Sequence, residues 1–298
     1  MLVDKRVPIG YLYNLVKYEM LIVLLLGVGI HYSTEKIYDY LPQMPLTIAT
    51  FLGTAISVLL SFKMSQSYER WWEARKIWGA IVNDSRSFVL QLQAFVKDPD
   101  AASQVKLIAY RQIAWCYCLG QSLRGLPSLE NCESFLSQDD IKRISRIKNK
   151  CLGILQLNVH EIRSLRNEDK LSDFENIQLN NTCVRFADSM GAAERINTTV
   201  FPTTYRMFLH FTIYLFVIIL SIALKDVMLL YEIPLLMLIS LVFFVLEKTA
   251  YHLQDPFRNR PSDISVTAIA RTIEINIRQL LGEEDVPDPI TKDEFYIM

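Results

Sequence analysis

The chain has 298 residues, of which 51% are hydrophobic and 21% charged, and its mean hydropathy is positive at +0.19. This mixture is typical of apolar membrane spans joined to a substantial polar body. The formal net charge is −1, with 31 basic and 32 acidic side chains, so the composition gives no electrostatic case for a nucleic-acid partner.

The first apolar segment, at about 18–32, follows the basic residues Lys5 and Arg6 and therefore has the general form of a signal peptide. However, Lys17 and Glu19 interrupt the approach to this segment, and no small-residue cleavage site follows it. The pattern predicts a retained first membrane helix.

The second apolar segment, at about 45–64, is the clearest membrane span. No charged residue occurs between Asp39 and Lys63, and the core of the segment is Leu46–Phe62. Pro45 stands just before this core, and proline is favoured in the first turn of a helix. About 20 apolar residues cross a hydrocarbon layer of roughly 30 Å, so the segment predicts a second membrane helix.

The region that follows, about 66–205, is polar and is expected to be helical. It opens with Trp71 and Trp72, a residue type that often anchors helices at membrane interfaces. Apolar residues three and four apart predict a helix over Ile141–Arg166. Proline, glycine and small polar residues indicate a loop just before it, at 125–140, and Asp139 or Asp140 is expected to cap the helix.

Two further spans are predicted at about 207–225 and 232–250. The third is uncharged between Arg206 and Lys225, and the fourth is uncharged between Glu232 and Glu247. The remaining residues, 251–298, are expected to join the polar region, with an extended acidic tail after residue 282.

Four spans place both chain ends on one side of the membrane, and the distribution of basic residues selects the side. Basic residues precede the first span and follow the second, whereas the two short loops between spans carry balanced charge: the basic residues are Lys5, Arg6, Lys17, Lys63, Arg70, Arg75 and Lys76. The positive-inside rule therefore predicts cytosolic termini and a cytosolic region formed by 66–205 and 251–298. We expect an all-α, multi-pass membrane protein forming a single unit over 1–298.

The second span carries two stripes of residues spaced by four. Gly53, Ser57 and Ser61 form a stripe of small residues, which allows membrane helices to approach closely. A second stripe, formed by Thr54, Val58 and Phe62, is turned by about 100° from the first. It could face a central axis and line a narrow apolar constriction, which conducts or gates by wetting. The pattern alone favours ordinary helix packing, since stripes of small residues are common in membrane bundles.

Other residue types give no catalytic signature. The five cysteines have no zinc-like spacing and are interpreted as buried free thiols. A haem protein with axial ligands His210 and His252 is an alternative, because both residues are expected near the cytosolic ends of their spans. No metalloprotease, triad or paired-carboxylate motif stands out, so we expect no enzymatic activity, no cofactor and no metal site.

Blocks distributed over nearly the whole chain are similar to those of the bestrophin family. The segment Ser61–Gly79 resembles the family's pore helix and the aromatic and basic residues after it. Further blocks match in the same order: Gly191–Ile196, Pro202–Tyr205, Asp255–Phe257 and Ala270–Asn276. Each motif is modest by itself, whereas together they are fairly specific.

The resemblance implies a homopentamer around one central pore, with a neck on the second span. The matching neck positions are Thr54, Val58 and Phe62. A second constriction at the start of the helix that leads to residues 194–195 points to Phe174 or Ile177.

The expected function is passive conduction of small inorganic ions in the bacterial inner membrane, with anions such as chloride favoured by the family. A monovalent-cation channel of the same fold remains open, as does a non-conducting scaffold. The expected partners are four further copies of the chain, the permeant ions and membrane lipid, with no nucleic acid.

The chain departs from the family pattern at two places. After Asp255–Phe257, eukaryotic members carry an acidic run that helps to bind calcium, whereas this chain has Arg258–Asp263, with one carboxylate and two arginines. Hard cations need several oxygen ligands, so calcium gating is not expected. The first neck position is Thr54, a hydroxyl residue where the family usually has an aliphatic one.

Overall fold

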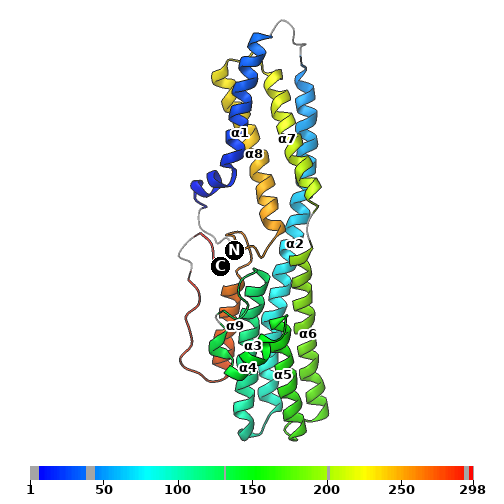
Figure 1. Ribbon diagram of the computed structural model, residues 1–298, viewed down its shortest axis with the longest axis vertical. Helices are drawn as coiled ribbons and strands as arrows, with labels where there is room; N and C mark the ends of the chain where they lie inside the picture. Colours follow the sequence, from blue (N-terminus) through cyan, green and yellow to red (C-terminus); the bar gives the residue numbers. More distant parts are fainter. Residues whose placement is uncertain (1–6, 38–43, 131, 200–201, 292–294, 298) are drawn as a thin grey trace. The chain divides into compact units, whose positions relative to one another are not determined.

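The computed structural model describes residues 7–37, 44–130, 132–199, 202–291 and 295–297, so Lys5, Arg6 and Asp39 lie outside the described residues. The described chain is built from α-helices, which confirms the expected all-α fold (Figure 1). It divides into two compact units. We call residues 7–70 and 202–255 the membrane unit, and residues 71–199 and 256–297 the polar unit, each with the gaps just given.

The membrane unit contains four helices that are long and apolar enough to cross a bilayer, as the sequence predicts. These helices are α1 (Ile9–Lys36), the first part of α2 (Leu46–Phe95), α7 (Thr203–Ala223) and α8 (Leu229–Gln254). Helix α2 continues beyond the membrane unit into the polar unit.

Proline marks the start of several of these helices. Pro8 and Pro202 are the N-cap residues of α1 and α7, and Pro45 directly precedes α2. Proline fits there because its ring fixes a backbone angle suited to the first turn, where its missing N–H would have no helical partner. Helix α1 begins well before the apolar segment predicted at 18–32. Its first turns contain polar residues, so a prediction based on hydropathy leaves these turns out.

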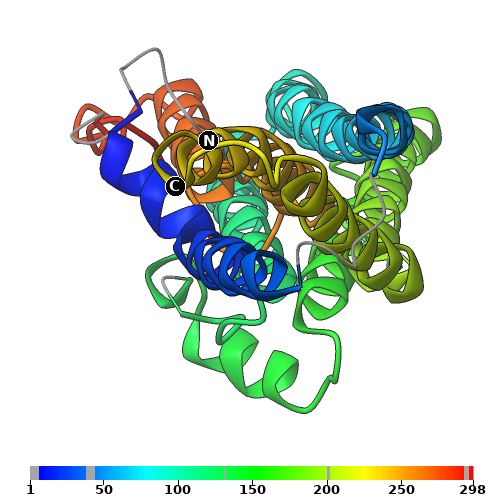
Figure 2. The same ribbon diagram turned by 90° about the horizontal axis from the view of Figure 1, so that it is seen from above.

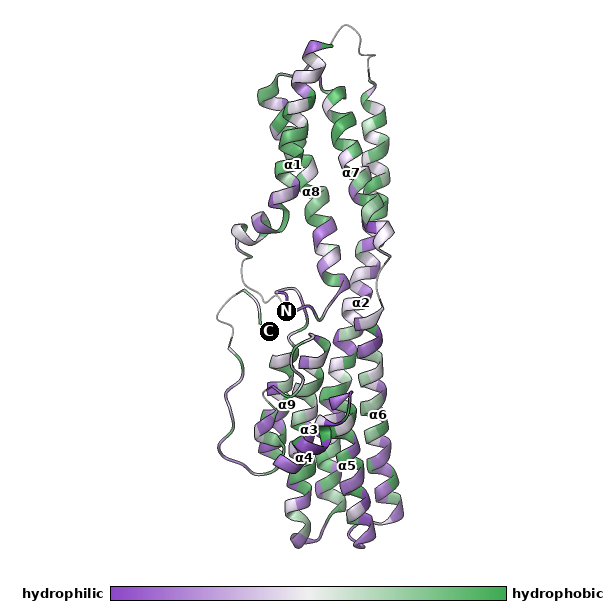
Figure 3. Ribbon diagram, in the orientation of Figure 1, coloured by the Kyte–Doolittle hydropathy of each residue, from purple (hydrophilic) through white to green (hydrophobic). Residues whose placement is uncertain are grey.

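Within the membrane unit, α7 and α8 lie between α1 and α2 (Figures 1 and 2). Buried apolar side chains from these helices form its core, including Val23, Ile56, Ile213 and Leu236. Many large apolar side chains also remain on the outside, and the hydropathy colouring shows these helices to be predominantly apolar (Figure 3). Exposed apolar side chains are expected where lipid replaces water as the solvent.

The polar unit packs the second part of α2 with shorter helices around a core rich in aromatic residues. The Phe88 and Phe186 rings meet edge to face at 5.6 Å, and Trp78 and Trp115 are fully buried. The other helices are α3 (Ala102–Leu123), α4 (Gln138–Ser145), α5 (Lys150–Asn167), α6 (Asp173–Thr198) and α9 (Val266–Leu280).

The helix predicted over Ile141–Arg166 is two helices, because the chain breaks between α4 and α5 and restarts with Asn149 as N-cap. The expected cap by Asp139 or Asp140 is also wrong in detail. Ser137 is the N-cap of α4, and Asp140 completes a capping box by accepting the Ser137 backbone N–H. Asp140 also accepts two hydrogen bonds from Arg111, at 2.8 and 3.1 Å, which ties α4 to α3.

All five cysteines are buried free thiols, as predicted. Burial raises the pKa of Cys116, Cys132 and Cys183 to about 12, so these thiols stay protonated at neutral pH. They therefore act as small core residues of the polar unit.

Candidate functional site

The stripe predicted to form the pore neck lies on an exposed face of α2. Thr54 is exposed, Val58 is 51% exposed and Phe62 is 64% exposed. The opposite face of the same helix is buried, with Ile56 and Leu60 in the core of the membrane unit. More than half of the Val58 and Phe62 side chains is therefore left for lipid, water or another subunit to cover.

The predicted small-residue stripe divides between two environments. A Cβ atom on Gly53 would lie 3.3 Å from the Phe216 ring of α7, so this glycine permits close packing within the chain. Ser57 and Ser61 are instead exposed. The Ser57 hydroxyl donates to the Gly53 carbonyl at 2.8 Å, and a hydroxyl satisfied in this way tolerates an apolar neighbour.

Polar contacts fasten α2 to α7 and α8. The Tyr205 hydroxyl of α7 donates at 2.8 Å to the carbonyl of Leu59, the residue that follows Val58 in the helix. Further along α2, the Arg70 Nε donates to the Gln254 carbonyl of α8 at 3.0 Å. Such contacts fix the rotation of α2 about its own axis, and hence which residues its exposed face carries.

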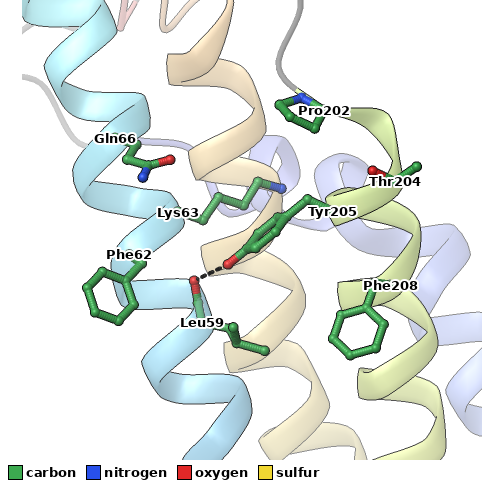
Figure 4. Close-up of a pocket in the computed structure, with 8 residues that line it drawn as sticks. All are labelled: Leu59, Phe62, Lys63, Gln66, Pro202, Thr204, Tyr205 and Phe208. Carbon is green, nitrogen blue, oxygen red and sulfur yellow. Dashed lines mark hydrogen bonds between the residues drawn. The ribbon is translucent and has the colours of Figure 1, made fainter.

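A groove opens between α2 and α7 at the level of Phe62 (Figure 4). Its volume is about 640 Å³, and the Tyr205 hydroxyl crosses it to reach the backbone of α2. Its lining is mainly apolar, with a few polar side chains: the lining residues are Leu59, Phe62, Lys63, Gln66, Pro202, Thr204, Tyr205 and Phe208.

Beside this groove, a carboxylate is buried among basic groups from different helices. Glu247 of α8 and Lys63 of α2 are completely buried, and the Lys63 Nζ donates to the Glu247 Oε1 at 2.7 Å. From α7, the His210 Nε2 lies 3.0 Å from the Glu247 Oε2, and the Arg206 Nε lies 3.9 Å from Oε1. Burying a charge without a partner is costly, so each member of this cluster depends on the others.

A second buried carboxylate, Glu232, lies at the start of α8. Its Oε2 is 2.6 Å from the His31 Nδ1 of α1, and its Oε1 accepts the Ser221 hydroxyl of α7 at 2.6 Å. Glu232 therefore joins α1, α7 and α8 at the end of α8 opposite to Glu247.

Sequence reasoning missed both carboxylate clusters as candidate sites. Lys63, Glu232 and Glu247 mark the edges of uncharged intervals, and for that reason they were interpreted as the ends of spans. Ionisable residues inside membrane helices are themselves a functional signal. The sequence contained this signal, but only the structure shows which side chains pair with these ionisable residues.

The other predicted site residues lie elsewhere. Phe174 and Ile177 are near the N-terminus of α6 in the polar unit and are 86% and 55% exposed. Of the proposed haem ligands, His210 contacts Glu247, and the His252 ring lies 6.1 Å from that of Tyr251. Over the described residues, no group of three His, Cys, Asp or Glu side chains is arranged to hold a metal ion.

The turn after α8 is closed by the chain itself. Asp263 is buried, and its Oδ2 accepts the Arg260 backbone N–H at 3.1 Å. Burial raises the pKa of this carboxyl above its usual value, an effect that the backbone donors of Arg258 and Arg260 partly oppose. The Trp71 Nε1 of α2 donates to the Ser262 carbonyl at 3.1 Å and holds the turn in place.

Comparison with known proteins identifies the family. Residues 9–279 match the family model of the bacterial and fungal bestrophin proteins. The voltage-dependent anion channel-forming protein YneE of Escherichia coli K12 is 35% identical over 253 residues, which are 84% of this chain and 82% of that protein. The protein of the same name from Salmonella typhi is 33% identical over the same shares of the two chains.

A solved structure supports the same family assignment. The crystal structure of a bacterial bestrophin homologue from Klebsiella pneumoniae superimposes with a TM-score of 0.83 at 27% sequence identity, over 91% of this chain and 100% of that one. Because the match covers both the membrane unit and the polar unit, the likeness extends beyond a shared set of membrane helices. The chain belongs to the bestrophin family.

Proposed function

We propose that this chain is one subunit of a homopentameric channel that conducts small anions, such as chloride, passively through one central pore. Support comes from relatives at 33–35% identity that are named as voltage-dependent anion channel-forming proteins. The likeness to a bacterial bestrophin homologue over nearly the whole chain adds to it. Pentamer and pore are the parts of the proposal that go beyond family membership.

The observation that carries the proposal is the exposed stripe of Thr54, Val58 and Phe62 on a membrane helix whose other face is buried. In a ring of five subunits with this stripe towards the axis, the three residues form stacked rings. The Thr54 hydroxyl donates to the Thr50 carbonyl at 2.9 Å, so the rings combine apolar surface with hydroxyls that already have an acceptor. Such a neck conducts when wetted and closes when water leaves it.

The polar unit supplies a second constriction in this proposal, at Phe174 or Ile177. Both residues lie within the first two turns of α6, where Ser172 and Glu175 form a capping box. A capped helix end is more rigid than a frayed one, which suits an apolar constriction formed by exposed side chains. In this arrangement the polar unit and both termini are cytosolic, and the channel lies in the bacterial inner membrane.

The decisive experiment reconstitutes the purified protein in a planar bilayer with a gradient of sodium chloride and measures the reversal potential. An anion channel gives a reversal potential near the chloride equilibrium potential. A value near the sodium equilibrium potential would replace the proposal with a cation channel of the same fold. A reconstituted protein that carries no current above that of protein-free membranes would contradict channel function altogether.

A further inference from the structure

We propose that the buried cluster of Lys63, Arg206, His210 and Glu247 sets the ionic selectivity of the pore, because it leaves an excess of positive charge directly behind the exposed face of α2. This inference rests on the proposed channel function and deepens it. The cluster belongs to the membrane unit, and its members come from α2, α7 and α8.

The charges in the cluster do not balance. Lys63 and Arg206 contribute two positive charges against the single negative charge of Glu247. The net charge is therefore +1 with a neutral His210 and +2 with a protonated one. Arg206 is the most exposed of these basic groups, and its guanidinium lies 4.0 Å from the centre of the Tyr251 ring, which retains it beside the cluster.

Neighbouring groups do not cancel this excess. The His210 ring meets the Phe244 ring edge to face at 5.9 Å, so its α8 neighbours are an aromatic ring and Glu247. The next charged residue of α8, Lys248, pairs with Glu19 of α1, and this pair adds no net charge. Its partner Glu19 belongs to α1, so this contact links α8 to α1 and not to α2.

The position of Lys63 places the excess charge near the proposed neck. Lys63 directly follows Phe62 along α2, and one residue turns the helix by about 100°. Phe62 therefore lies on the exposed face while Lys63 is completely buried behind it. The two residues also line the same groove between α2 and α7 (Figure 4).

A buried charge at this position acts on the pore more strongly than a surface charge. Protein and lipid have a low effective dielectric constant, and buried charges are screened by salt much less than exposed ones. Five subunits would surround the neck with five such clusters. Fixed charge around a narrow passage raises the local concentration of the oppositely charged ion, which here is an anion.

Glu247 allows this arrangement to exist. A lysine buried without a partner would lose its proton or destabilise the fold, since its desolvation would be uncompensated. The carboxylate keeps Lys63 buried, and Arg206 and His210 restore the positive excess. If the cluster served only to join α2 to α8, the sign of its net charge would have no consequence for the permeating ion.

The test measures the chloride-to-sodium permeability ratio from reversal potentials in three variants. Lys63→Met removes a positive charge, and the ratio should fall by roughly twofold to tenfold, as expected for a unit charge at intermediate dielectric constant. Glu247→Gln removes the negative charge, and the ratio should rise by a similar factor. The double variant Lys63→Met/Glu247→Gln has the net charge of the wild type, and its ratio should return to within about twofold of the wild-type value.

The variant Lys248→Met is the matched control, because it removes a partly buried lysine from α8 at the neutral pair with Glu19. It should change the permeability ratio less than Lys63→Met does. Conducting single variants that shift the ratio in the same direction, or not at all, would overturn the inference. If the single variants fail to assemble, a double variant whose ratio departs strongly from the wild-type value would overturn it as well. Failure of the wild type to conduct would instead reject the proposed function.

Discussion

Asp263 is a buried carboxylate that closes the turn after α8. The equivalent turn in eukaryotic relatives is expected to be acidic, whereas here the carboxylate accepts the Arg260 backbone N–H. Because its pKa is raised by burial, the ionised carboxylate is less stable in the folded protein than in water. Its hydrogen bond holds the turn closed. The cost of burying the carboxyl rises with pH, because a larger fraction of it is then ionised.

This raised pKa predicts a pH-dependent stability that Asp263→Asn should remove. A carboxyl whose pKa is higher in the folded state contributes stability below its unfolded pKa, and this contribution is lost as pH rises through the folded pKa. Wild-type protein should therefore lose thermal stability relative to Asp263→Asn as the pH rises from about 4 towards neutrality. Unfolding midpoints of both proteins measured over this range provide the check. An identical pH dependence in the two proteins would contradict the assignment.

Calcium should not switch the conductance. One buried carboxylate held by Arg260 and flanked by arginines is a poor site for a cation that prefers six to eight oxygen ligands. We expect bilayer currents to remain unchanged when calcium is raised from a chelated solution to micromolar levels. The matched control titrates magnesium over the same range to reveal general screening by divalent ions. Steep activation specific to calcium would require carboxylates from another part of the chain.

At the residue scale, the sequence predicted the chemical state of the cysteines but not which side chains contact one another. The free thiols follow from the nature and number of the cysteines, whereas the N-cap at Ser137 was misassigned to the neighbouring aspartates. Ser, Thr and Asp all cap helices well, so sequence alone seldom decides among adjacent candidates. The Lys63–Glu247 pair joins residues 184 positions apart, and no local pattern reports such a contact.

At the scale of elements, the apolar segments and the prolines beside them predicted the membrane helices. What they did not predict is the length of α2, which runs over 50 residues from Leu46 to Phe95. Its second part is more polar, so the hydropathy pattern marks the end of the apolar segment but not the end of the helix. Likewise, the break between α4 and α5 at 146–149 interrupts a periodic pattern that would suit one continuous helix.

Helix α2 yields a prediction for Val58, which stays a hypothesis about the neck. If Val58 faces the axis, Val58→Ala removes two methyl groups from each subunit at the narrowest region, and the pore should wet more easily. Single-channel conductance or open probability should then rise, whereas Val58→Phe should narrow the ring and reduce the current. Ile56→Val, on the buried face of α2, serves as control and should leave the current per channel unchanged.

The two Val58 variants distinguish a pore-facing residue from one that faces lipid. A lipid-facing Val58 would tolerate both substitutions with unchanged conductance and open probability in an intact oligomer. That result would show that this face of α2 does not line the pore. The same would hold for Thr54 and Phe62, since the three residues share one stripe.

At the scale of the whole molecule, the sequence indicated a membrane part and a polar part, and the structure separates them as two compact units that share α2. Neither the sequence nor the single chain reveals the number of subunits, because that number depends on contacts between copies. The exposed residues Ser57 and Ser61 on a membrane helix, together with family membership, lead to the expectation of a closed ring.

Assembly is therefore the last prediction, and mass measurement in mild detergent tests it. The protein should elute and ionise as five chains of 34.5 kDa each. Ser57→Phe places a bulky ring at an exposed position of α2 where a close approach of helices needs a small side chain, so this variant should lose the pentamer. Ser145→Phe, at the end of α4 in the polar unit, introduces the same ring at another exposed serine and should leave assembly intact. Monomers or dimers of the wild type would refute the ring. A pentameric Ser57→Phe protein would instead move the subunit contact to another face of α2.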